Sequence, residues 1–151
     1  MKWPMKWIDT PPVWLAAFCA MGWGLAVLLP EPPLGPWSVP VGPVLVAAGL
    51  VLMFAAVVEL RRHRTTVVPH REARALVTTG IYRFSRNPIY LGDVLFLAGF
   101  LVWLGAALPL LLIPVFAWVL QRRFIIPEER RLRASFGPAW ERWAERTRRW
   151  I

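Results

Sequence analysis

Two polar clusters, each beside a long apolar segment, hold the residues that could do chemistry. The first covers residues 83–92 and reads Arg-Phe-Ser-Arg-Asn-Pro-Ile-Tyr-Leu-Gly; the second covers 127–131 and reads Pro-Glu-Glu-Arg-Arg. A membrane protein has little reason to place an arginine-rich loop and paired carboxylates at the same end of one helical hairpin. A polar, multiply charged ligand at the membrane surface would supply that reason, so the two clusters predict a binding site.

The first cluster contains a helix start. Asn is favoured at the N-cap and Pro at the first helical position, so Asn87 and Pro88 predict that a helix begins here. Its free N–H groups, near Arg83 and Arg86, would attract a carboxylate or phosphate. Gly92 would let a backbone or ligand approach closely. A well-capped membrane helix explains the Asn-Pro pair but not its arginine neighbours.

The paired acids Glu128 and Glu129 permit two interpretations. They can complement a helix dipole and pair with arginines at neighbouring turns. Alternatively, one carboxylate accepts hydrogen bonds from a bound cofactor, as an acid does for a ribose diol in dinucleotide-binding folds. Spacing alone leaves both interpretations open.

Four apolar segments must position these clusters. They cover 13–29, 39–58, 89–104 and 106–126, and the chain of 151 residues is 57% hydrophobic, above the globular norm of roughly 45–50%. A membrane core needs about 20 apolar residues, with a range of about 17–25. We therefore expect one all-α membrane domain with about four transmembrane helices. Residues 1–60 would form two anchoring spans, and residues 80–151 the half that carries the site.

The distribution of basic residues predicts the topology. All 18 Lys and Arg lie before the first segment (Lys2 and Lys6), within 61–86, or within 122–149. Four spans put these regions on one side, which the positive-inside rule makes cytoplasmic, as in a bacterial-type inner membrane. Both termini are then cytoplasmic.

Topology and anionic lipids also account for the net charge of +9, so we expect anionic lipids and no nucleic acid as partners. The lone Cys19 gives no thiolate cluster that could bind a metal.

The second half of the chain has two further features. The short turn at 104–109 predicts a tight antiparallel hairpin of the third and fourth spans. After the Gly-Pro break at 137–138, Trp140, Trp143, Thr147 and Trp150 follow a helical spacing with charged residues mostly elsewhere. This pattern is typical of an amphipathic helix lying on the membrane surface. The alternative is that Trp140 and Trp143 form the floor of a binding site.

An ordered set of motifs runs through the second half of the chain: Gly80-Ile81-Tyr82, Arg86-Asn87-Pro88-Ile89-Tyr90-Leu91-Gly92, Glu128-Glu129 with Leu132, Phe136-Gly137, Trp140 and Trp143. Over roughly residues 80–149, this set resembles the isoprenylcysteine carboxyl methyltransferase and phospholipid methyltransferase superfamily of integral-membrane enzymes. Many relatives have His at the position of Asn87 and Tyr at those of Trp140 and Trp143, which leaves the substrate open.

The resemblance implies S-adenosylmethionine as methyl donor and a lipophilic acceptor that enters from the bilayer. On this resemblance the acceptor would be an isoprenylcysteine-like carboxylate, a phospholipid amine or a small lipophilic thiol. Arg83 or Arg86 would hold an anionic group of the cofactor or acceptor, with Arg86 the candidate catalytic residue. The cofactor-binding positions carried over are Tyr82, Arg86, Asn87, Pro88, Tyr90, Gly92, Glu128 and Glu129.

Asp93 is the second candidate catalytic residue. It lies one turn inside the third segment, where a carboxylate is costly and usually functional. It could orient or deprotonate an amine acceptor. The alternative is that Asp93 lies at headgroup depth and pairs with an arginine.

Two other functions of the protein also remain open. One is a nicotinamide-dependent membrane reductase of related fold, whose known examples are much longer, and the other is a non-catalytic membrane scaffold.

Overall fold

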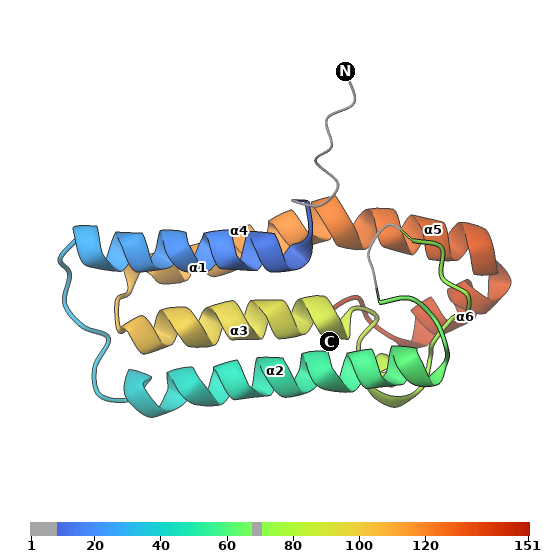
Figure 1. Cartoon of the computed structure of the whole chain (residues 1–151), viewed down its shortest axis with the longest axis horizontal. Helices are drawn as coiled ribbons and strands as arrows, with labels where there is room; N and C mark the ends of the chain where they lie inside the picture. The colour runs from blue at the N-terminus through green and yellow to red at the C-terminus, as the bar shows by residue number, and fades with distance from the viewer. Residues whose placement is uncertain (1–8, 68–70) are drawn as a thin grey trace, which may run out of the picture.

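Four helices run side by side, each antiparallel to its neighbour in the chain (Figure 1). They are α1 (Pro11–Leu28), α2 (Ser38–Arg62), α3 (Pro88–Leu104) and α4 (Leu112–Leu120). The computed structural model describes residues 9–67 and 71–151; the basic residues Lys2 and Lys6 lie outside this part. Within it, α3 occupies the centre of the bundle and packs against α1, α2 and α4.

The lengths of the helices agree with an all-α membrane protein. Among the described residues, three helices are long and apolar enough to cross a membrane: Pro11–Leu28, Ser38–Arg62 and Leu108–Phe136. The fourth, α3, is a shorter apolar helix of 17 residues, at the lower end of the about 17–25 that a span requires. The predicted fold class is therefore confirmed.

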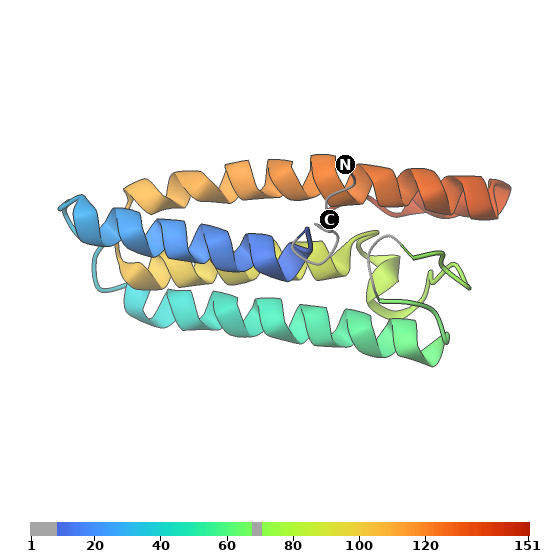
Figure 2. The same ribbon diagram turned by 45° about the horizontal axis from the view of Figure 1, so that its top comes forward.

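The fourth span differs from its prediction, because it does not stop near residue 126. A 3₁₀ turn (Leu108–Leu111), α4, a π-helical turn (Gln121–Ile125) and α5 (Ile126–Phe136) form one continuous helix, which Figure 2 shows along its length. Within the π turn the N–H of Ile126 bonds to the carbonyl of Gln121, five residues back. Pro127 follows at once, and its missing N–H cannot continue an α-helical ladder. Glu128 and Glu129 therefore lie inside a continuous helix. No free helix N-terminus lies beside them in the described structure, so the interpretation that they complement a helix dipole is not supported.

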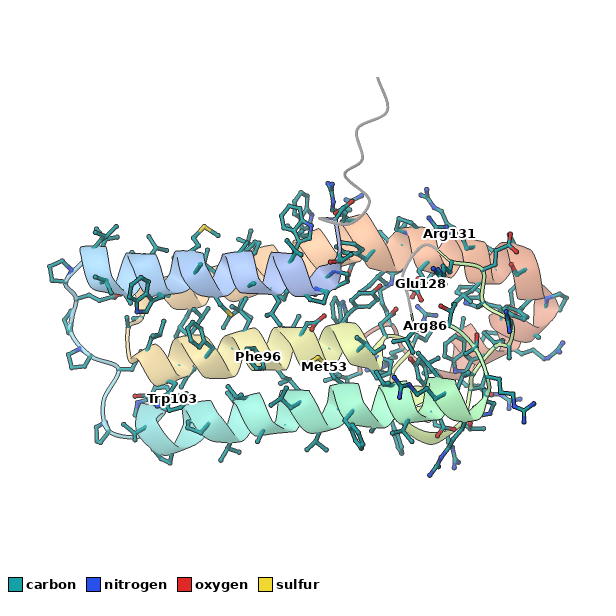
Figure 3. The ribbon with its side chains drawn as sticks, viewed as in Figure 1. Met53, Arg86, Phe96, Trp103, Glu128 and Arg131 are labelled. Carbon is teal, nitrogen blue, oxygen red and sulfur yellow. The ribbon has the colours of Figure 1, made fainter. Side chains whose placement is uncertain are left out.

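Glycines set the close packing of α2 on α3. A Cβ added to Gly92 would lie 2.5 Å from Cγ of Met53 and 2.8 Å from the carbonyl oxygen of Gly49. One added to Gly99 would lie 2.5 Å from the backbone nitrogen of Val46. Small residues at such positions let two membrane helices approach closely. Figure 3 places Met53 between the two ribbons.

The two ends of the bundle differ in chemistry. At one end, the α1–α2 connection meets the α3–α4 turn, where the N–H of Leu34 donates to the carbonyl of Gly105 at 2.7 Å and Glu31 accepts from the N–H of Leu108. Gly105 ends α3 with φ 74°, which confirms the tight hairpin. η2 (Gly80–Arg83) and the arginine-rich α5 and α6 (Pro138–Arg146) lie at the other end (Figure 1).

Cysteine labelling tests which end faces the cytoplasm. In a Cys19→Ala background, Pro36→Cys marks the arginine-poor end and Ser135→Cys the arginine-rich end, and both positions are exposed. We expect a membrane-impermeant maleimide to modify Pro36→Cys in intact cells and Ser135→Cys only after permeabilisation, since arginines favour the cytoplasmic side. Labelling of both positions in intact cells would refute the predicted topology.

Candidate functional site

A cavity of about 430 Å³ opens at the arginine-rich end of the bundle. Its volume is within the roughly 300–1,000 Å³ usual for small-molecule sites. The beginning of α1 and the second half of α2 supply apolar walls, including Pro11, Pro12, Met53 and Leu60. The loop before α3, the first turns of α3 and the first turn of α5 supply the polar groups.

Most of the predicted site residues meet at this cavity. Figure 3 shows Arg86 and Glu128 at the end of the bundle where α3 begins and α5 passes. Gly92 is the exception, because it does not line the cavity and its missing side chain is accounted for by the contact with α2. The predicted residues that line the cavity are Tyr82, Arg86, Asn87, Pro88, Tyr90, Asp93, Glu128 and Glu129.

The start of α3 is where the sequence predicted it, but Asn87 has another role. The helix begins at Pro88, and Asn87 makes no side-chain capping hydrogen bond. Its side-chain amide instead donates to Oε1 of Glu129 at 3.3 Å and to the carbonyl of Arg149 at 3.1 Å. The cap interpretation of the Asn87 side chain was therefore wrong: this amide joins the α3 start to α5 and to the last residues of the chain.

Glu128 is held by one aromatic neighbour. The hydroxyl of Tyr90 donates to Oε2 of Glu128 at 2.9 Å, and the Tyr90 ring stacks on Phe124 with ring centroids 6.2 Å apart. The positive charge of Arg131 also acts on this carboxylate. Phe124 belongs to the π turn, so this turn and the glutamate that follows it are fixed against α3 together.

Glu129 is buried, 8% exposed, and three residues approach its carboxylate: Arg149 and Asn87 donate hydrogen bonds, and Arg86 forms an ion pair. Arg149 approaches both oxygens: its Nη2 lies 2.8 Å from Oε2, and its Nε lies 3.2 Å from Oε2 and 3.3 Å from Oε1. The Nε of Arg86 lies 3.3 Å from Oε1. Charge-assisted, two-pronged pairs of this kind are the strongest polar contacts in proteins. Sequence reasoning missed Arg149 because no local spacing links it to Glu129 or Asn87.

Arg86 is largely engaged by the protein. Its Nη1 donates to the carbonyl of Ala144 at 3.2 Å, and its guanidinium lies 5.6 Å from the centre of the Trp140 ring. Its buried Nε has no hydrogen-bond partner among the described residues, so the role of Arg86 in holding an anionic group during catalysis stays a prediction. Arg83 is exposed and does not line the cavity.

The tryptophan face of α6 packs on the site. Trp143 is buried, lines the cavity and donates from Nε1 to the carbonyl of Tyr82 at 3.0 Å. This placement supports the interpretation of Trp143 as part of the floor of a site, whereas Trp140 does not line the cavity. Burial raises the pKa of the Tyr82 hydroxyl well above its ordinary value, and the charges of Glu128 and Glu59 raise it further. Tyr82 therefore stays a neutral phenol.

Asp93 is a buried carboxylate, 4% exposed, one turn into α3. In the part of the chain that the structure describes, its Oδ2 has no hydrogen-bond partner and the residue forms no ion pair. The alternative of an arginine partner was therefore wrong. Burying an unpaired carboxylate is costly, so an orphan of this kind needs an explanation such as a ligand.

The described residues thus form a helical bundle with a largely apolar cavity at one end, lined by the carboxylates of Asp93, Glu128 and Glu129. The model of the family described as phospholipid methyltransferase matches residues 37–139, more than half of the chain. The chain belongs to this family, whose members are membrane methyltransferases, and the suspected resemblance is confirmed. No protein in the curated set matches the chain.

Proposed function

We propose that this protein transfers a methyl group from S-adenosylmethionine to a lipophilic acceptor that enters the cavity from the bilayer. The observation that carries the proposal is the cavity itself. It combines the carboxylates of Asp93, Glu128 and Glu129 with apolar walls from α1 and α2. Membership of a membrane methyltransferase family supports this function over a nicotinamide-dependent reductase or a scaffold.

The residues present fit this methyl donor. S-adenosylmethionine carries a positively charged sulfur, an amino group and a ribose diol, and carboxylates in a poorly solvated cavity favour such groups. Glu128 receives one hydrogen bond from Tyr90, and its two oxygens have room to accept more from a ligand. The donor, when bound, supplies an electrophilic methyl group on sulfur.

The protein's own contribution is to align two reactants and exclude water. An in-line displacement forms the bond from the acceptor's nucleophilic atom to the methyl carbon as the sulfur–methyl bond breaks, so no covalent enzyme intermediate is needed. Asp93 takes the proton that the acceptor gives up, or orients it, because its orphan Oδ2 belongs to a cavity-lining residue. Pro11, Pro12 and Met53 shield the reacting atoms from water.

Of the three acceptor classes, an amine fits this cavity best. An anionic carboxylate would need a cation near it, and Arg86 is already engaged by Glu129 and by the carbonyl of Ala144. Asp93, in contrast, has no cationic partner in the described part of the chain and complements a protonated amine. A phospholipid amine therefore has both the chemistry and the apolar tail that this site accommodates.

Calorimetry on the purified protein in lipid nanodiscs tests the proposal. We expect S-adenosylmethionine to bind with a micromolar Kd, equivalent to about −8 kcal/mol at 1 μM. Transfer of a labelled methyl group should then favour a phosphatidylethanolamine over a prenylated cysteine. Binding of NADPH in place of S-adenosylmethionine would indicate a reductase, and binding of neither would indicate a scaffold.

A further inference from the structure

We propose that Arg149 is a positioning residue of the methyl-donor site: it fixes the carboxylate of Glu129 from behind the cavity. Arg149 does not itself line the cavity, whereas Glu129 does. The inference rests on the proposed function, because it assumes that Glu129 faces a bound donor.

The backbone around Arg149 is attached to the site at two places. On one side, the carbonyl of Arg148 accepts from the N–H of Arg86 at 3.0 Å, and the carbonyl of Arg149 accepts from the Asn87 amide at 3.1 Å. On the other side, Nε1 of Trp150 donates to Oε1 of Gln121 at 3.1 Å, in the π turn. Through these two backbone carbonyls and the Trp150 side chain, residues 147–151 therefore join the loop before α3 to the long fourth helix.

The side chain of Arg149 sets the orientation of Glu129. It contacts both carboxylate oxygens, whereas Arg86 and Asn87 approach Oε1 alone. Without Arg149, the described contacts would hold only one oxygen, and the carboxylate could rotate about that point. Arg149 thus stabilises one rotamer of Glu129, which a methyl donor in the cavity would contact.

This pair differs from an ordinary surface ion pair. Exposed pairs contribute little because water screens them. The Glu129 side chain is only 9% exposed, although that of Arg149 is 34% exposed. The hydrogen bond to Glu129 also raises the pKa of Arg149, so the guanidinium stays charged. Because the Arg149 side chain is partly exposed, it can be substituted without opening the core.

Three variants test the inference by calorimetry with S-adenosylmethionine and by steady-state kinetics. Arg149→Gln should raise the donor Kd by about tenfold or more, as expected for a lost charge-assisted hydrogen bond. Arg149→Lys keeps the charge without the two-pronged geometry and should give an intermediate Kd. The matched control Arg148→Gln changes an exposed neighbouring side chain and should stay within about twofold of wild type.

The kinetic split separates positioning from general damage. At saturating donor, kcat of Arg149→Gln should stay within about threefold of wild type, because the acceptor side is intact. In a double-mutant cycle, Glu129→Gln combined with Arg149→Gln should weaken binding no more than Glu129→Gln alone. Should Arg149→Gln fail to fold, Arg149→Lys decides the matter: wild-type donor affinity in a folded Arg149→Lys protein overturns the proposal.

The outcomes also distinguish this inference from the proposed function. If the wild-type protein does not bind S-adenosylmethionine, both the proposed function and this inference are refuted. If wild type binds but Arg149→Gln and Arg148→Gln have the same Kd, the function stands and the positioning role of Arg149 is refuted. A parallel fall in kcat and thermal stability with unchanged Kd would likewise refute it.

Discussion

Asp93→Asn is expected to lower turnover by about 100-fold or more, the usual scale for a positioned acid–base group. The substitution keeps the size of the side chain and removes its negative charge. In the described part of the chain, Oδ2 of Asp93 has no partner, so the change breaks no ion pair there. The Kd for S-adenosylmethionine should stay within about threefold, because the donor's polar groups are assigned to α5 and the loop before α3.

Two comparisons make this result interpretable. Glu141→Gln is the matched control, because Glu141 is an exposed acid that pairs with Arg133 outside the cavity, and its turnover should be unchanged. Thermal unfolding of Asp93→Asn should occur at or above the wild-type temperature, since a costly buried charge is removed. Lower stability with unchanged turnover per folded molecule would show that Asp93 is structural.

The sequence was sufficient for the parts of this fold that depend on local pattern. Apolar runs and the placement of arginines predicted the spans and the shared end of the two polar clusters. The structure brings Tyr90 and Glu128 into contact there, although 38 positions separate them. Two helices that begin at or pass the same end of a bundle must place their polar residues at that end together, so the juxtaposition follows from topology.

Contacts that depend on the exact rotation of a helix could not be predicted in this way. The π turn before Pro127 changes the direction in which Glu128 and Glu129 point, and periodicity assumes a regular 3.6-residue turn. Gly92 illustrates a related difficulty. A glycine near a polar cluster permits either a ligand or another helix to approach. Only the structure shows that α2 approaches Gly92, through Met53 and Gly49.

The role of Arg149 was beyond sequence reasoning for a different reason. The segment that carries it returns to the site after α6, and its contacts with the α3 start span more than 60 residues. The amphipathic pattern after residue 138 predicted a helix on the membrane surface, but the tryptophan face packs on the protein. A tryptophan can bury its ring in either environment while its N–H finds a partner, so composition does not distinguish them.

Glu128→Gln is expected to weaken binding of S-adenosylmethionine by about 10-fold to 100-fold, the effect of losing a hydrogen bond to a charged group worth about 1.5–3 kcal/mol. Glutamine has the same shape and can still accept the hydrogen bond from Tyr90, so α5 should keep its place.

Tyr90→Phe is the companion variant, because it removes the O–H that orients Glu128 and leaves the ring stacked on Phe124. Its effect on Kd should be in the same direction and smaller. Calorimetry on both variants, with Glu141→Gln as control, measures the contribution of Glu128 directly. If Glu128→Gln binds the donor as wild type does while Tyr90→Phe binds it weakly, the donor contact belongs to the phenol and Glu128 serves only to hold it.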